Sequence, residues 1–348
     1  MRLDPLHGSI EAGGERREGV ARMPWWSSGS GPGPVPDPAA ERRQRQQEIE
    51  RQERDQDLLE RGQLPGAAAA RLAEIGSGQG KLSFTSDLAA DEAGLLRRHG
   101  LAPLCLVGGS AMYHVGIAYA SSWHDTEVAQ LSAAYNEATR LAVGRLRQEA
   151  VALGAHGVVG VRYALVRHEW ADRTVEVTLV GTAVRQEGGP SQPWLSDLSG
   201  QEWWALWRAG YEPVALAYGH CTWFVLTTQM DEWNEQSSIN QELGHFSDAL
   251  GQCRTRASMH LKQIARESGA SGVVGVHMSR RIDEVRLTGS DDNPAYEREH
   301  HNVVLSMIGT AIRPRAGAAP RVPETRLVLS LRAGRLEAAE TAAEAAFS

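Results

Sequence analysis

An eight-residue sequence that occurs twice constrains the fold of this chain more than any other feature. Gly154–Val161 is GAHGVVGV, and Gly269–Val276 is GASGVVGV, 115 positions further along. Each copy follows a long helical pattern, so we expect Gly154 and Gly269 to end a helix in the left-handed conformation that glycine adopts easily. The valines that follow suit a half-buried strand. Both copies therefore predict a helix that turns directly into a strand.

Two further pairs of matched segments extend this repeat. GTAVR at Gly181–Arg185 matches GTAIR at Gly309–Arg313, and Ser86–Gly109 matches Ser196–Gly219 at a constant offset of 110. The second pair has ten identities in 24 ungapped positions, in the pattern SDLxxxExxxLxRxGxxPxxLxxG. The chain is therefore duplicated, and we predict domains at 82–188 and 193–314. The motif residues expected to shape both domains are Gly154, Gly157, Gly160, Gly181, Thr182, Gly269, Gly272, Gly275, Gly309 and Thr310.

Each repeat predicts a short helix, a strand, a long helix and a two-stranded hairpin. Ser86 or Asp87 is expected to cap the first short helix. The predicted bounds are Leu104–Val107 and Val214–Tyr218 for the first strands, Glu127–Leu153 and Gln236–Ser268 for the long helices, and Thr174–Val184 and Asn302–Ile312 for the last strands. Alternation in the last strands predicts a three-stranded antiparallel sheet with one covered face. A strand–helix–strand crossover keeps its strands parallel, so the last strand is expected between them.

The segments outside the repeats are less informative. Residues 1–40 are rich in Gly, Pro, Ser and charge, which predicts disorder, and Trp25-Trp26 within them is either a docking element or a chance apolar island. Residues 41–80 predict two helices, Glu41–Arg61 and Ala67–Ile75, the first as a solvated helix or a short coiled-coil strut. A glycine-rich linker follows, one residue short of the P-loop spacing. Residues 315–348 predict a linker, a strand at Arg326–Arg332 and a helix from Leu336.

Composition excludes several classes of protein. The net charge of −7 gives no general attraction to nucleic acid or to anionic membranes. No apolar run approaches the roughly 20 residues of a membrane span, and the N-terminus has no apolar segment typical of a signal peptide. Three cysteines without CxxC spacing indicate reduced thiols. We therefore expect a cytoplasmic protein.

The order of strand, long helix ending in GAxGVVGV, strand, and strand ending in GTAV resembles the YbjQ-like family, whose members also carry a heavy-metal-binding label. The resemblance covers Leu82–Arg185 and Pro193–Arg313. It implies an α+β fold of two tandem β-α-β-β two-layer domains similar to dodecin subunits. It also implies assembly into ring-shaped oligomers, in a mostly bacterial family without an established biochemical role.

The residues of this chain give little support to the heavy-metal-binding label. The candidates are His114, His220 and Cys221, but no CxxC or HxxxH spacing supports them. At the repeat offset of 110, His220 matches Ser110 and Cys221 matches Ala111, and Cys253 lies in the apolar stripe of its helix. Outside the ambiguous hairpin alignment, no His or Cys of one repeat matches a His or Cys of the other. A physiological metal site is therefore not the favoured prediction.

Catalytic motifs are also absent from the sequence, which contains no G-x-S-x-G elbow, Walker sequence, HExxH or dinucleotide fingerprint. We therefore predict a non-enzymatic scaffold or binding module without a cofactor, and as the alternative a heavy-metal-binding or metal-sensing protein. A closed homo-oligomer is expected, unless the strand at Arg326–Arg332 caps a sheet edge within the chain. The N-terminal arm could recruit protein partners.

Overall fold

The computed structural model of the chain describes residues 38–76, 85–115, 124–167, 174–228, 240–286, 299–317, 329–330 and 337–338. The chain divides into two compact units, Met1–Glu53 and Arg54–Ser348. Residues 1–37, with Trp25-Trp26, and the linker residues 77–81 lie outside the described part. None of the described helices combines the length and the apolar character that crossing a bilayer requires.

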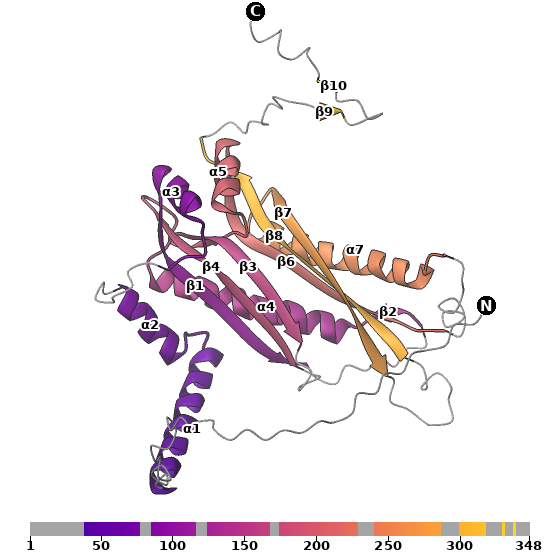
Figure 1. Cartoon of the computed structure of the whole chain (residues 1–348), viewed down its shortest axis with the longest axis horizontal. Coiled ribbons are helices and arrows are strands. Elements are labelled where there is room, and N and C mark those ends of the chain that lie inside the picture. The colour runs from indigo at the N-terminus through magenta and orange to yellow at the C-terminus, as the bar shows by residue number, and fades with distance from the viewer. Residues whose placement is uncertain are drawn as a thin grey trace, which may run out of the picture. The chain divides into compact units, whose positions relative to one another are not determined.

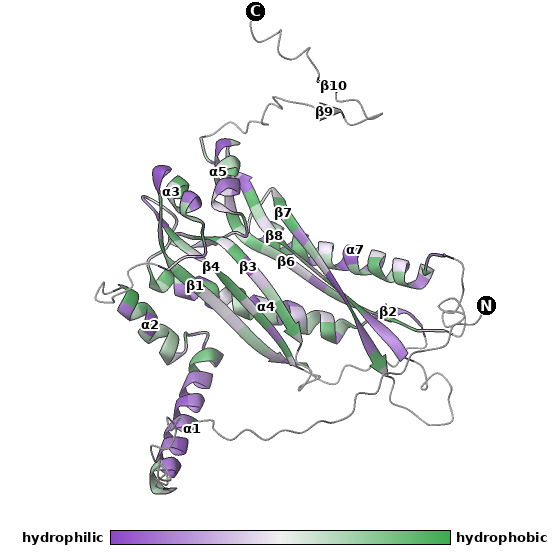
Figure 2. Ribbon diagram, viewed as in Figure 1, coloured by the Kyte–Doolittle hydropathy of each residue, from purple (hydrophilic) through white to green (hydrophobic). Residues whose placement is uncertain are grey.

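Two helices precede the repeats, as the sequence predicts. Helix α1 spans Pro38–Glu60 and α2 spans Gly66–Gly76. The described side chains of α1 are mostly exposed, in keeping with its hydrophilic colouring in Figure 2. Helix α2 instead packs against a later helix through Leu72, and Arg71 forms an ion pair of 2.6 Å with the buried Glu149. The predicted solvated helix is therefore α1, and α2 contributes to the core.

We call the predicted domains at residues 82–188 and 193–314 repeat 1 and repeat 2. Sheet 1 is formed mainly by repeat 1 (Figure 1). Its strand order is β1-β4-β3-β5. The elements of this part are α3 (Ala90–Arg98), β1 (Leu101–His114), β2 (Thr126–Glu127), α4 (Ala129–Ala152), β3 (Gly157–Arg167) and β4 (Thr174–Gln186). Strand β4 pairs antiparallel with both neighbours, so the prediction of a central last strand is confirmed here.

Sheet 2 is formed mainly by repeat 2 and has the order β2-β6-β8-β7. Its elements, with the strand that joins sheet 1, are β5 (Trp194–Leu195), α5 (Gly200–Arg208), β6 (Tyr211–Val225), α7 (Gly244–Glu267), β7 (Gly272–Arg286) and β8 (Glu299–Pro314). Strand β8 is central and antiparallel to both β6 and β7, which confirms the same prediction. The mixed α+β architecture therefore agrees with the sequence.

The two sheets share their register as well as their strand order. The pair Leu101↔Gln186 in sheet 1 corresponds to Tyr211↔Pro314 in sheet 2, at the sequence offsets of 110 and 128. Both hairpins contain a bulge after the second valine of GVVGV, where Gly160 has φ +64° and Gly275 φ +66°. Residues with a side chain rarely adopt a backbone φ of this sign, so the bulge explains the second glycine of the strand motif.

Each long helix lies directly on its sheet at a glycine. A Cβ atom at Gly109 would lie 2.2 Å from the carbonyl oxygen of Ala142 in α4, and one at Gly219 would lie 2.0 Å from that of Ala257 in α7. No side chain fits there, so the last glycine of the SDL pattern permits close helix–sheet packing. The helices end where expected, since Gly154 and Gly269 have φ of +63° and +72°.

Several predicted details were wrong. Each sheet has four strands rather than three, because β5 and β2 cross over to the sheet of the other repeat. The first strands are longer than the predicted segments, and residues 240–243 of the predicted second helix are not helical. The predicted C-terminal helix is also contradicted, since Glu337–Ala338 pairs as a strand with Leu329–Ser330. That pair forms a sheet of its own, so the alternative in which this strand caps an edge of a main sheet is not seen among the described residues.

Candidate functional site

The repeated SDL and GTA motifs bind each other in both sheets. Ser86 Oγ lies 2.8 Å from Thr182 Oγ1, and Thr182 donates to Asp87 Oδ1 at 3.1 Å. The backbone N–H of Leu88 donates to Ser86 Oγ. The matched contacts in repeat 2 join Ser196 and Asp197 to Thr310, and Leu198 to Ser196. Ser86 and Asp87 therefore anchor the chain to the central strand instead of capping α3, whose N-cap is Ala89.

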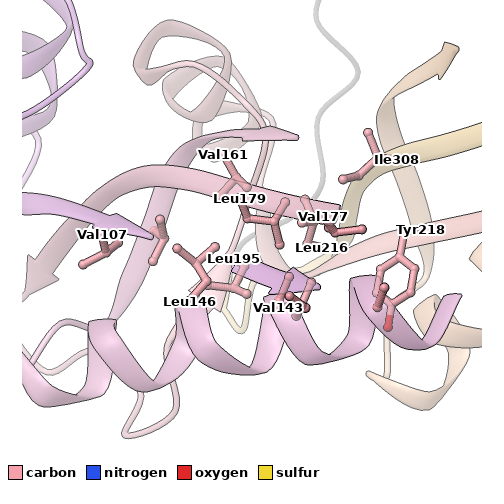
Figure 3. Packing of buried hydrophobic residues seen from close by; sticks show 14 of the residues in the cluster. Val107, Val143, Leu146, Val161, Val177, Leu179, Leu195, Leu216, Tyr218 and Ile308 are labelled. Carbon is pink, nitrogen blue, oxygen red and sulfur yellow. The ribbon is translucent and has the colours of Figure 1, made fainter. Parts of the chain in front are cut away.

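The two repeats meet at a joint in which α4 lies between the sheets. Helix α4 contacts β1 and β4 of sheet 1 and also β6 of sheet 2. Figure 3 shows Leu146 and Val143 on α4 with Leu216, Tyr218 and Ile308 of the second sheet nearby, and all five belong to one buried apolar cluster. Burying a side chain of this size contributes about 1.5–3 kcal/mol. The joint is therefore a continuous core and not a loose linker contact.

Backbone pairing closes the joint at both ends. Strand β2, just before α4, pairs antiparallel with β6 through Thr126↔Phe224 and Glu127↔Trp223. Strand β5, just before α5, pairs parallel with β3, and Val161 N donates to Ser196 O at 3.0 Å. Each repeat thereby adds a short strand to the sheet of the other.

His220 is the polar centre of the joint. It lies on β6, is buried, and faces α4. Asn136 of α4 accepts from its backbone N–H at 3.1 Å and donates to its carbonyl at 3.0 Å. Thr139 Oγ1 lies 3.0 Å from Nε2, and Ser306 Oγ lies 2.9 Å from Nδ1. Both ring nitrogens therefore have a hydrogen-bond partner within the protein.

The network assigns the His220 tautomer. Thr139 donates its hydroxyl proton to the carbonyl of Tyr135, so its oxygen accepts from His220 Nε2–H. Nδ1 is then the acceptor for the Ser306 hydroxyl. Burial, and secondarily the nearby His260, lower the pKa of His220 to about 3, so the ring is neutral near pH 7. A neutral ring with both nitrogens engaged has no lone pair left for a metal or a substrate.

Aromatic and charged groups surround this histidine. The ring of Tyr163 on β3 stacks on that of His220 at 5.7 Å between centroids, and burial raises the pKa of the Tyr163 hydroxyl. Tyr135 of α4 accepts from Arg281 at 3.1 Å, and Arg281 forms an ion pair of 2.7 Å with Asp283. Arg281, which reaches the joint, is therefore paired with a carboxylate of its own strand.

Several hollows among the described residues open onto the joint, and two of them have mixed charge. One, of 320 Å³, lies between β3 and sheet 2 and is lined by Tyr163, Asp197, His277, Met278 and Ser306, among others. Burial raises the pKa of Asp197 there, against the opposing effect of the Thr310 hydrogen bond. The other, of 680 Å³, is lined by three tryptophans together with polar groups, at Trp194, Trp203 and Trp207. Acidic and basic side chains are mixed in both, so neither favours one ligand charge.

The structure separates the three metal candidates. His220 and Cys221 are neighbours on β6 and point to opposite faces of the sheet, because side chains alternate along a strand. Cys221 lies against Cys253 of α7, and both are buried, as predicted for Cys253. His114 is exposed at the end of β1 in the other sheet. Among the described residues, no three His, Cys, Asp or Glu side chains gather as metal ligands would.

The segment between β7 and β8, residues 287–298, lies outside the described part, which resumes at Glu299 with His300 and His301 after it. Of the paired histidines there, His300 is buried and accepts from the N–H of Thr227, and His301 lies 3.1 Å from the Thr227 hydroxyl. These contacts are those of side chains fixed within the fold.

Sequence reasoning missed the partners of His220. Asn136, Thr139 and Tyr163 lie 57 to 84 positions away, and no spacing within the sequence joins them. One available clue was the polar residues in α4, since Ser132, Asn136 and Thr139 form a stripe at steps of four and three beside the apolar one.

Known proteins similar to this chain support one family assignment. Residues 106–187 match the family model described as "YbjQ_1: Putative heavy-metal-binding", in one copy. The chain is 35% identical over 204 residues to the "Encapsulin nanocompartment protein Rv1762c" of Mycobacterium tuberculosis, which covers 57% of this chain and 78% of that protein. No solved structure matches significantly. The chain therefore belongs to the same family as this mycobacterial protein and carries a YbjQ-like domain.

Proposed function

We propose that this chain is a non-enzymatic, self-assembling scaffold protein of an encapsulin nanocompartment in the cytoplasm. It would consist of two tandem YbjQ-like β-α-β-β domains, at residues 82–188 and 193–314. The relative from Mycobacterium tuberculosis is named as a nanocompartment protein, and it resembles more than half of this chain. The proposal extends that name to the present chain.

The observation that carries the proposal is the joint around His220. Buried polar side chains that meet at one point often form a catalytic or binding site. Here the ring nitrogens contact Thr139 and Ser306, and the backbone of His220 is held by Asn136. A group with every partner supplied by the protein serves to fix one domain on the other. This polar cluster is thus suited to holding the two domains together and not to chemistry.

The alternative of a heavy-metal-binding or metal-sensing protein has no comparable support. His220 and Cys221 lie on opposite sides of sheet 2, with α4 on one side and α7 on the other. Burial and a hydrogen bond with Cys221 raise the pKa of Cys253, the hydrogen bond having the larger effect. A thiol with a raised pKa is a poor ligand, because metals bind the thiolate. We therefore propose no cofactor and no catalytic residue.

The arm before the repeats would carry contacts with protein partners. The described side chains of α1 are mostly exposed, and the helix combines many charged residues with few apolar ones. Such a helix gains little from packing on its own fold and is free to contact another protein.

The test is the mass of the full chain in solution, by size exclusion with light scattering at low protein concentration and ordinary salt. We expect a defined multiple of the 37.8 kDa chain mass. Electron microscopy of the same fraction should show particles of uniform size. A single-chain mass under these conditions would overturn the scaffold function.

A further inference from the structure

The joint between the repeats consists of two different surfaces. Repeat 1 contributes what we term the helix surface, formed by β2, the outer side of α4 and the outer edge of β3, along which β5 pairs. Repeat 2 contributes the sheet surface, formed by the outer face of β6 and β8 and the segment Trp194–Leu198. Within the chain these two surfaces cover each other.

Repeat 1 also carries a sheet surface, and this one is open. Leu106, Ser110 and Met112 on β1 match Leu216, His220 and Thr222 on β6, at the offset of 110. Thr222 is 0% exposed beneath α4, whereas Met112 is 56% exposed. Leu106 and Ser110 are likewise more exposed than their matched residues. The face that α4 covers in sheet 2 is therefore uncovered in sheet 1.

Repeat 2 carries the complementary open helix surface. Leu243 and Val276 are 37% and 43% exposed, and the residues that match them in the joint, Val128 and Val161, are 5% and 4% exposed. Helices α4 and α7 both contain 24 residues, but α4 buries ten of them and α7 only five. The difference arises because α4 is covered on two sides. Among the described elements, α7 makes its extensive contacts with sheet 2 alone, and its outer side is exposed.

The open surfaces already have the backbone geometry of the joint. Leu243, at the entry to α7, has φ −84° and ψ 89°, and Val128, which pairs with β6, has φ −86° and ψ 79°. The bulge that presents the Val161 N–H to Ser196 recurs at Val276. Ser86 is anchored to its own sheet by Thr182, as Ser196 is by Thr310. No rearrangement of these segments is needed for a second contact of the same kind.

The outer strand edges of the two repeats differ in the same way as their helices. Gly157 on β3 lies against Trp194, whose ring would be 2.2 Å from an added Cβ, whereas no heavy atom of the described residues lies within 4 Å of that position at Gly272 on β7. Strand β3 has β5 along its outer edge, and β7 is the last strand of its sheet. An uncovered strand edge of this kind is a template for pairing with another chain.

We propose that the helix surface of repeat 2 docks on the sheet surface of repeat 1 of a second copy of this chain. The α7 outer side would cover Leu106, Ser110 and Met112, and the β7 edge at Val276 would pair with the segment at Ser86. The proposal rests on the scaffold function and specifies its interface. Because the two surfaces differ, the contact is head-to-tail, and each added copy presents one free surface of each kind until the assembly closes.

The experiment uses two variants of the full chain, Val276→Asp and Met112→Asp, each of which places a charge on one surface only. Each alone should run at the 37.8 kDa chain mass in size exclusion with light scattering. An equimolar mixture should recover a dimer of two chains and nothing larger, because the Val276→Asp chain keeps its sheet surface and the Met112→Asp chain keeps its helix surface. Val151→Asp, on an exposed part of α4 outside both surfaces, is the matched control and should assemble as the unaltered chain does.

The outcomes are distinguishable. An oligomer that persists in both variants overturns this interface and leaves the scaffold function standing, whereas a monomeric unaltered chain overturns the scaffold function itself. Dissociation of both variants without recovery in the mixture shows a like-with-like contact and also overturns the proposal. Circular dichroism verifies folding. If Val276→Asp fails this check, Val276→Ser replaces it, and Met112→Ser likewise replaces Met112→Asp.

Discussion

The neutral state of His220 makes the stability of the protein depend on pH in a calculable way. The ordinary pKa of histidine is about 6.5, and burial beside His260 lowers that of His220 to about 3. Between these values the unfolded chain binds a proton at this position and the folded chain does not. Stability is therefore fully present above the unfolded pKa and is lost as pH falls below 6.5.

The expected loss follows from this difference. At pH 5 the unfolded state gains about 2 kcal/mol from protonating this one residue, and at pH 7 it gains only about 0.2 kcal/mol. Lowering the pH from 7 to 5 should therefore reduce the free energy of unfolding by about 2 kcal/mol through His220 alone. Other titrating groups add their own pH dependence, so the His220 contribution must be isolated by substitution.

The assay is urea unfolding followed by tryptophan fluorescence at pH 7 and pH 5, at one fixed protein concentration. His220→Gln cannot titrate, so its pH-dependent loss should be about 2 kcal/mol smaller than that of the unaltered chain. His114→Gln is the control for removing a histidine, because it leaves His220 in place. Equal pH-dependent losses in the unaltered chain and His220→Gln, within about 0.5 kcal/mol, would refute the buried neutral histidine.

Two further substitutions and one elemental analysis test other parts of the structure. Thr310→Val removes the hydroxyl that binds Asp197 and should lower the free energy of unfolding by about 1–3 kcal/mol; no change in the urea midpoint would contradict an anchoring role for the motif pair. Gly219→Ala places a Cβ atom 2.0 Å from a backbone oxygen of α7 and should cost about 1–3 kcal/mol or more, with a normal thermal melt as the opposing result. Elemental analysis of the untagged chain should find no stoichiometric transition metal; about one per chain, lost in His220→Ala with Cys221→Ser, would favour the metal alternative.

The sequence predicted elements whose cause is local. GAxGVVGV specifies a helix end and a strand through the properties of glycine and valine, and Gly154 and Gly269 adopt the expected left-handed conformation. The central position of β4 and β8 also followed, because a crossover leaves few arrangements for a third strand. The bulge at Gly160 did not follow, since an alternating pattern gives no indication that one residue is out of register.

The role of SDL could not be predicted because its cause is distant. Ser86 and Asp87 precede a short helix, and that position favours a capping role. Their partner Thr182 is 95 to 96 residues away and competes successfully for the same side chains. In repeat 2 the cap is Ser199, which accepts from the N–H of Glu202, and Ser196 is left to bind Thr310. Tertiary contacts decided a choice that the local sequence left open.

His220 shows a different limit. The comparison of matched positions discounted it because its counterpart is Ser110, and that comparison treats the two repeats as equivalent surroundings. They are not equivalent, since β6 lies under α4 and the outer face of β1 is open. A side chain that belongs to the joint is therefore expected to lack a counterpart. The mismatch excluded a site common to both domains and left unseen a residue that distinguishes them.

This distinction bears on the strength of the proposed contact between chains. In the joint, Asn136 and Thr139 satisfy the backbone and ring of His220. The matched residues of α7 are Gly251 and Arg254, and they would face a serine at the position of His220. The same backbone geometry would thus lack the polar contacts that hold the joint, which favours pairing of each α4 with its own sheet 2 over an exchanged pairing.

The contact between chains should accordingly be weaker than the joint, and the oligomer should dissociate before any chain unfolds. Dilution across the range in which the mass falls to that of one chain should leave the far-ultraviolet circular dichroism unchanged. The tryptophan fluorescence should also keep the emission of buried side chains. Trp194 and Trp203 lie in a buried cluster within one chain, with Val184 and Leu96. Loss of helical signal in step with loss of mass would show that the joint depends on assembly. The two contacts would then form one cooperative unit.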